Sequence, residues 1–434
     1  MTTKERIEGM LSPYRVLDLT DEKGLMCGKL LGDLGADVIK VERPGGDATR
    51  NIGPFYHDEV DPEKSLFWFA FNTSKRGITL DIEKAEGREI LKRLVKGADI
   101  VIESFAPGYL DGLGLGYADL EKVNPGVIMV SITPFGQSGP YRGYKAPDIV
   151  AWGMGGQMYS VGPPEHPPVQ ISHHAQAYLH GSVEAAVGAM VALFEKQSSG
   201  KGQHVDLSIQ SSLAQATYML TASWDHGQTI RPRQDPESTR EVARMQRVWP
   251  CKDGFVMWFF FPGEAGKRRN PPLIEWMDSE GMANDFLREF DWEAFGVPPT
   301  PEELLEETPD ERRQRLQTRR EALEEPTGKF FMSHTMAELM DGAVKHRVTL
   351  YPLNNTAAIL ESAQLAARGF WAEVEHPELD TTITYPGAFT WASETPPGIS
   401  RRAPLIGEHN EEVYQQELGM SAEEIQSLKQ AGVI

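Results

Sequence analysis

The sequence predicts an α/β fold built on a doubly wound parallel sheet, and two observations carry this prediction. From residue 15 to residue 208, short apolar runs alternate with segments of helical periodicity. Alternation of this kind gives a parallel sheet with helices on both faces. The pattern changes near Trp224, and at 434 residues the chain is long enough for a second domain.

The first elements follow one another in strand, helix, strand order. Residues 15–19 (RVLDL) are an expected strand, residues 24–34 a helix that ends before Gly35, and residues 37–42 (DVIKVE) a second strand. The alternation continues with a strand at 77–82, a helix at 84–97, a strand at 99–105, a helix at 117–124 and a strand at 126–133. Ligands of such sheets usually bind in the connections that follow the strands.

A helix rich in small residues is expected next, over residues 181–196. The turn SSGKGQ follows it and leads into an expected strand at 204–208 and a helix at 208–223. Small side chains would let this first helix approach another element closely.

Beyond Trp224 the sequence becomes irregular, which is typical of a linker. Residues 249–263 (WPCKDGFVMWFFFPG) predict a hairpin-like pair of strands, and the charged run at 301–325 predicts a solvated helix face. Near the end, Ser421 and Glu424 form an expected capping box at the start of a helix.

Composition narrows the possible functions. The net charge is -20, from 43 basic and 63 acidic side chains, which disfavours binding to nucleic acid or to an anionic membrane. The first twelve residues lack the apolar run of a signal peptide, and no apolar run is long enough to span a bilayer. Two cysteines, Cys27 and Cys251, are too few for a disulfide framework. We therefore expect a cytoplasmic protein that holds any anionic ligand with local basic groups.

Local motifs do not identify a reaction. His173, His174 and His180 lack metal-site spacing and a cysteine partner, so we expect no metal. The nucleophile elbow G-x-S-x-G, the phosphate loop G-x-x-x-x-G-K-[ST] and the dinucleotide signature G-x-G-x-x-G are not found where they would be needed.

Several longer stretches together resemble the family III CoA-transferases, a family that includes formyl-CoA and carnitine CoA-transferases. The matching text lies at 15–20, 30–50, 72–117, 200–214, 360–379 and 401–434. The resemblance implies an interlocked dimer in which each chain has a doubly wound large domain and a smaller α+β domain. It suggests residues 1–223 for the first part of the large domain, 224–240 for a linker, 241–348 for the small domain and 349–434 for the part that returns to the large domain.

The resemblance also implies a carboxylate nucleophile. In the family, an Asp before the small-residue helix attacks the thioester and forms a mixed anhydride, which splits one difficult step into two easier ones. A count back from the helix places this position at Tyr178, and no Asp occurs from 149 to 205. The loop after residue 20, DEKGLMCG, also departs from the family's G-P-x-A-G. Glu184, six residues further on, is out of register for the role.

Four residues match the family's CoA contacts. The resemblance implies that Arg43 lies at the nucleotide end, Phe105 beside the adenine, Leu80 in an apolar contact and Lys145 close to the bound CoA. Two positions depart from the pattern: Ser104 replaces a frequent Asn, and Gly112 replaces a frequent Arg that would face phosphate.

Three functional hypotheses remain open. The first is a subunit of a heteromeric CoA-transferase whose homologous partner carries the Asp nucleophile, moving CoA from a donor such as succinyl-CoA to a carboxylic acid, for which benzylsuccinate is a candidate. The second is a stand-alone acyl-CoA transferase or isomerase with an altered catalytic residue. The third is a non-catalytic CoA-binding assembly protein. The first assigns no catalytic residue to this chain.

Overall fold

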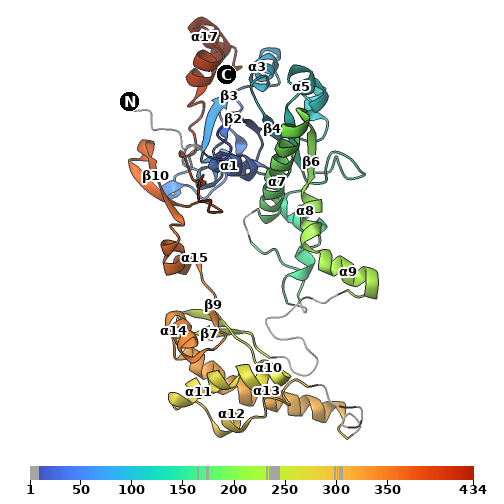
Figure 1. The fold of residues 1–434 in the computed structure, drawn as a ribbon, viewed down its shortest axis with the longest axis vertical. Coiled ribbons are helices and arrows are strands. Elements are labelled where there is room, and N and C mark those ends of the chain that lie inside the picture. The colour runs from blue at the N-terminus through green and yellow to red at the C-terminus, as the bar shows by residue number, and fades with distance from the viewer. Residues whose placement is uncertain are drawn as a thin grey trace. The chain divides into compact units, whose positions relative to one another are not determined.

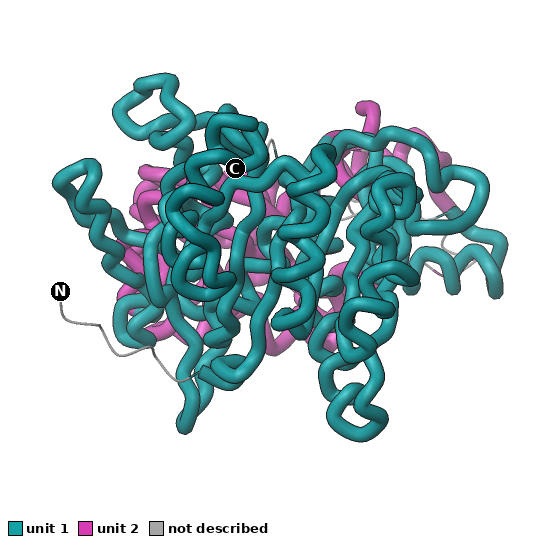
Figure 2. Tube along the Cα trace, turned by 90° about the horizontal axis from the view of Figure 1, so that it is seen from above, with its two compact units in different colours: residues 1–159, 170–230, 364–434 teal, residues 160–169, 231–363 magenta. Residues whose placement is uncertain are grey.

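A computed structural model describes residues 9–163, 166–172, 175–230, 233, 245–297, 300, 302 and 306–434. The chain forms two compact units (Figures 1 and 2). Unit 1 comprises residues 1–159, 170–230 and 364–434, and unit 2 comprises residues 160–169 and 231–363. Both chain ends therefore belong to unit 1, in which three separate segments of the sequence fold together.

The core of unit 1 is a six-stranded parallel sheet in the order β3-β2-β1-β4-β5-β6. Its strands are β1 (Arg15–Leu19), β2 (Asp37–Glu42), β3 (Lys75–Thr79), β4 (Ile100–Glu103), β5 (Ile128–Thr133) and β6 (His204–Ser208). Leu17 of β1 pairs with Ile39 on one side and with Val101 on the other. The strand order reverses between β1 and β4, which confirms the predicted doubly wound sheet.

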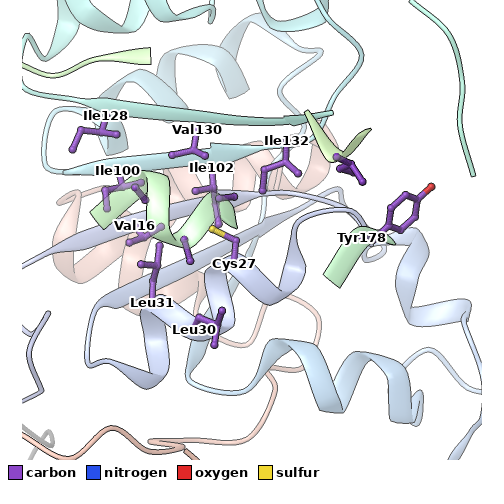
Figure 3. Close-up of a cluster of buried hydrophobic side chains, with 14 of the residues drawn as sticks. Val16, Cys27, Leu30, Leu31, Ile100, Ile102, Ile128, Val130, Ile132 and Tyr178 are labelled. Carbon is purple, nitrogen blue, oxygen red and sulfur yellow. The ribbon is translucent and has the colours of Figure 1, made fainter. Parts of the chain in front are cut away.

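Helices cover both faces of this sheet. On one face α1 (Leu25–Asp33) and α7 (Gln176–Ser199) pack against residues such as Val16, Ile102 and Val130 (Figure 3). On the other face lie α3 (Ala85–Val95), α5 (Tyr117–Val123), a π-helix at Glu412–Glu417 and α17 (Ala422–Gln430). Strands β1, β2, β4 and β5 are buried on both sides, and this explains their largely apolar sequences, whereas the edge strand β6 is partly exposed.

The other helical elements of unit 1 are short. They are α2 (Leu66–Asn72), α4 (Tyr109–Gly112), α6 (Asp148–Met154), α8 (Ile209–Ala216), α9 (Tyr218–Gly227) and 3-10 turns at Ala48–Asn51, Tyr56–Asp58, Met158–Ser160 and Pro377–Leu379. An antiparallel pair, β10 (Trp371–His376) and β11 (Thr381–Pro386), completes this unit, and α16 (Ala363–Ala367) begins at its boundary.

Unit 2 is a small α+β assembly. Its antiparallel sheet contains β7 (Val248–Cys251), β8 (Gly254–Met257) and β9 (Tyr351–Pro352). Its helices are α10 (Gly263–Arg269), α11 (Pro271–Ser279), α12 (Asp285–Glu289), α13 (Pro309–Met332), α14 (Met336–His346) and α15 (Thr356–Leu360). Aromatic side chains fill the core, including Trp249, Trp258 and Phe331.

Three elements differ clearly from the sequence-based expectation. The small-residue helix expected at 181–196 is α7, which begins at Gln176, so Tyr178 lies in its first turn and not before it. The helix expected at 208–223 is two helices, because the backbone at Thr217 leaves the helical region. Strand β3 begins at Lys75 and not at Gly77. The extra residues are charged but paired: the Lys75 ammonium donates to Asp18 Oδ2 at 2.8 Å, and Arg76 Nη2 donates to Asp37 Oδ2 at 2.7 Å. Buried charges of this kind require such partners.

Among the described helices, α7 alone is long and apolar enough to cross a bilayer by length and composition. Half of its apolar window is buried inside the protein, as is common for the core helix of a soluble protein. In the described ranges no three His, Cys, Asp or Glu side chains form a possible metal site, while His173 and His174 lie outside those ranges.

Candidate active site

A cavity of about 900 Å³, called here the large cavity, lies at the carboxyl edge of the unit 1 sheet. Its walls come from the connections after β1, β2, β4 and β5, from α2, from the start of α6 and from the first turn of α7. The lining residues used below are Glu22, Lys23, Ser104, Phe105, Arg142, Lys145, Asp148 and Tyr178. Because β1 and β4 flank the point where the strand order reverses, this is where open α/β sheets usually bind ligands.

Tyr178 lines this cavity, and its hydroxyl group is bonded to a neighbouring backbone carbonyl. The residue is 6% exposed, and its hydroxyl donates to the carbonyl oxygen of Ala146 at 2.9 Å. Figure 3 shows the ring at the end of the apolar cluster, with the hydroxyl directed away from the aliphatic side chains. Burial, reinforced by the negative charges of Glu22 and Asp148, raises the pKa of Tyr178. The phenol therefore stays protonated near neutral pH.

Asp148 is a carboxylate that the sequence analysis did not single out. It lies one residue before the Asp-free range, and its Oδ1 accepts the backbone N–H of Tyr178 at 3.0 Å. Gln170 Nε2 donates to its other oxygen at 3.3 Å. Burial raises the pKa of Asp148, although the bonds from the first turn of α7 oppose this effect. Since Ala175 offers no side-chain cap, Asp148 caps α7 from a neighbouring element.

Glu22 is a second carboxylate in the large cavity, within the loop that departs from the family pattern. Burial, followed by the charge of Asp21, raises its pKa. The adjacent Lys23 is bonded to Asp21 and not to Glu22. Ser104 holds the loop, because its Oγ accepts the N–H of Asp21 at 2.8 Å and donates to Asp21 Oδ1 at 2.7 Å. Glu184 does not line the cavity.

The four predicted CoA contacts are only partly brought together. Phe105 and Lys145 line the large cavity. Arg43 does not, and its guanidinium, 69% exposed, is paired with Glu83 Oε1 at 3.1 Å. The Tyr109 hydroxyl donates to the same oxygen at 2.8 Å while its ring stacks on Phe105, so Arg43 is linked to the cavity wall through these side chains. Leu80 is 2% exposed and packs in the core.

A smaller cavity of about 420 Å³, called here the small cavity, shares part of its lining with the large cavity. Its own lining includes the polar side chains of Glu103, Ser131 and His204. Glu103, 4% exposed, accepts the N–H of Phe105 at 2.7 Å. Burial raises the pKa of Glu103 to about 7. Ser131 Oγ lies 2.8 Å from His204 Nε2, and burial lowers the pKa of that imidazole. This end of β4 therefore carries a carboxyl group that changes charge near neutral pH.

The sequence as a whole matches one enzyme family. The sequence model described as CoA-transferase family III matches residues 11–286 and 282–410. This chain belongs to CoA-transferase family III. The assignment confirms the predicted enzyme class and its acyl-CoA substrate.

Individual relatives of this family III chain cover nearly its whole length. It is 34% identical over 424 residues to a Thauera aromatica protein named succinyl-CoA:(R)-benzylsuccinate CoA-transferase subunit BbsE, with 98% of each chain covered. It is 31% identical to a Streptomyces coelicolor formyl-CoA:oxalate CoA-transferase, with 100% of each covered. A crystal structure of a CAIB/BAIF family protein from Brucella suis has a TM-score of 0.78 at 27% identity, covering 94% of this chain and 99% of that one.

Proposed function

We propose that this family III chain is the subunit of a heteromeric CoA-transferase that works with a homologous chain bearing the Asp nucleophile. The observation that carries the proposal is the state of Tyr178, the residue that the family resemblance puts at the nucleophile position. Its hydroxyl is bonded to the Ala146 carbonyl oxygen and its pKa is raised, so it offers neither a carboxylate nor a phenolate to a thioester. A phenol cannot form the mixed anhydride that the family's reaction passes through.

The partner's Asp would then perform the covalent steps. One oxygen of its carboxylate attacks the carbonyl carbon of the donor thioester, the carbon–sulfur bond breaks, and CoA leaves as a thiolate. The acyl group is held as a mixed anhydride. The acceptor carboxylate attacks the Asp carbonyl carbon of this anhydride and displaces the donor acid as a free carboxylate. The thiolate then attacks the acceptor's acyl carbon, which forms the new thioester and releases the Asp carboxylate. This sequence returns the Asp carboxylate unchanged and needs no metal or redox cofactor in its balance.

The exposed face of α7 supports pairing with another chain. Val183, Val187, Val191 and Phe194 are 43%, 58%, 63% and 73% exposed, and their spacing places them on one side of the helix. The opposite side of α7 packs on the sheet. A continuous apolar stripe of this kind is typical of an interface. We assign it to the homologous Asp-bearing subunit in an interlocked dimer.

The names of the relatives suggest the substrates. Succinyl-CoA is the donor in the names of the Thauera aromatica subunit and of a Chloroflexus aurantiacus succinyl-CoA–L-malate CoA-transferase beta subunit, which is 29% identical. We propose succinyl-CoA as the donor here and an arylsuccinate such as benzylsuccinate as the acceptor. Phe105 and Lys145 would contact CoA directly, with Arg43 at the nucleotide end and Leu80 supporting the wall from the core.

A second candidate is a stand-alone transferase, and the two carboxylates of the large cavity favour it. Glu22 and Asp148 both line the cavity beside Tyr178. Either could in principle form an anhydride, although the oxygens of Asp148 already accept bonds from Tyr178 and Gln170.

Transfer by the purified chain alone separates the two candidates. The chain is incubated with succinyl-CoA and a panel of carboxylates that includes 2-benzylsuccinate, and the new thioester is measured. We expect no turnover from the wild type, Glu22→Gln or Asp148→Asn. Turnover that is abolished by one of these two changes would make that residue the nucleophile and the second candidate correct.

A further inference from the structure

A turn at residues 139–145 carries two positive charges to the large cavity. The Tyr144 N–H donates to the Tyr141 carbonyl oxygen at 2.8 Å. The Tyr141 ring also contacts the rings of Tyr144 and Phe135, at centroid separations of 5.3 and 5.9 Å. These contacts hold the turn, so the two cationic side chains that it presents line the cavity from a defined position.

Neither of these cations, Arg142 and Lys145, is neutralised by a neighbour that the structure describes. A third cation in the lining, Lys23, is bonded to Asp21. By contrast, no carboxylate within the described ranges lies within 4.0 Å of the Arg142 guanidinium or the Lys145 ammonium. In a chain of net charge -20, uncompensated cations in a concave wall draw an anion to that wall.

Arg142 stands at the boundary between the two cavities. It lines both of them, as do Ala106 and Pro107. Among the described residues that line the small cavity, Arg142 is the only Lys or Arg, while Asp111 lies in the same wall.

We propose that Arg142 binds an oxyanion of the acyl-CoA substrate at the boundary between the large and small cavities. This inference rests on the proposed function, since it requires CoA to bind in this chain's own cavity. The oxyanion is either a CoA phosphate or the free carboxylate of a dicarboxylic acyl group. The planar guanidinium fork can bind either one through two parallel hydrogen bonds.

Calorimetric titration of the full-length chain, both alone and in complex with its homologous partner, tests the proposal. The ligands are CoA, pantetheine, which lacks the phosphates, and succinyl-CoA. For Arg142→Ala we expect CoA affinity to fall roughly 10- to 100-fold, the range for one hydrogen bond to a charged group, with pantetheine affinity unchanged. If the oxyanion is the acyl carboxylate, the loss appears for succinyl-CoA alone. Arg93→Ala, in α3 and lining neither cavity, is the matched control.

The outcomes are distinguishable. Equal affinities of wild type and Arg142→Ala for all three ligands would overturn the role of Arg142 while leaving CoA binding intact. A wild-type chain that binds none of the three ligands, either alone or in the complex, would instead refute the CoA site of the proposed function, and the role of Arg142 with it. Arg142→Gln, which keeps most of the side-chain volume, is measured in parallel so that a folding defect in one variant does not decide the result.

Discussion

Glu103 is a buried carboxyl group at the end of β4 that gives a residue-scale prediction. Its pKa is raised to about 7 because burial disfavours the charged form, compared with 4.5 for the unperturbed group. Between these values the folded chain holds a proton that the unfolded chain releases. The free energy of unfolding is therefore highest below pH 4.5. It falls by about 1.4 kcal/mol per pH unit as the pH rises toward 7, and above pH 7 this contribution is lost.

The variant Glu103→Gln should remove this dependence, because glutamine resembles the protonated acid and never ionises. We expect its free energy of unfolding, relative to wild type, to rise by roughly 2–3 kcal/mol between pH 5 and pH 8 in urea unfolding. Glu89→Gln, an exposed position on α3, is the control. A difference between Glu103→Gln and wild type that is the same at both pH values would contradict the assignment.

At the residue scale, Phe105 and Lys145 were expected near CoA only because of the family resemblance. Both line the large cavity, and their contact with CoA stays a prediction. Glu22 and Asp148 were missed because they reach the site from distant parts of the sequence. Only the folded chain brings the loop after β1 and the start of α6 against the first turn of α7. The only local signal for Asp148 was its own place in the first turn of α6, where acidic residues are favoured.

Helix α7 gives the prediction at the scale of an element. Its exposed stripe lies opposite its buried face, so Val187→Asp should leave the fold intact and disrupt pairing with the homologous subunit. An unpaired carboxylate in a dry interface costs several kcal/mol, and association should weaken by roughly 100-fold or more.

Analytical ultracentrifugation of the co-expressed chains measures this effect. Val60→Asp, the same change at a loop residue that is 83% exposed, should associate as the wild type does. Undiminished association of Val187→Asp would mean that the stripe does not bind the partner.

The sequence predicted elements well where apolar patterning alone decides the structure. Strands β1, β2 and β6 coincide with the expected residues, and the Ser421–Glu424 capping box opens α17 as expected. The start of β3 was misplaced because Lys75 is buried with Asp18 and Asn72, a tertiary arrangement that hydropathy cannot reveal. The break at Thr217 was missed because no Gly or Pro marks it.

For the whole molecule, the order of motifs along the chain was the decisive signal. Matching text at both ends of the sequence predicted the family, and unit 1 does contain both ends. The interlocked dimer and the domain limits at 223, 240 and 348 stay predictions. Interlocked chains complete each other's cores, so such dimers often have no stable folded monomer.

The central claim is that this chain supports a nucleophile carried by its partner. The most direct measurement is CoA transfer from succinyl-CoA by the complex of this chain with an Asp-bearing homologue. The account predicts that activity vanishes when the partner's Asp is changed to Asn, while Tyr178→Phe in this chain leaves most of it. Two results would contradict the account. One is a loss of activity in Tyr178→Phe as large as that caused by the partner's change, and the other is full activity after the partner's Asp is replaced.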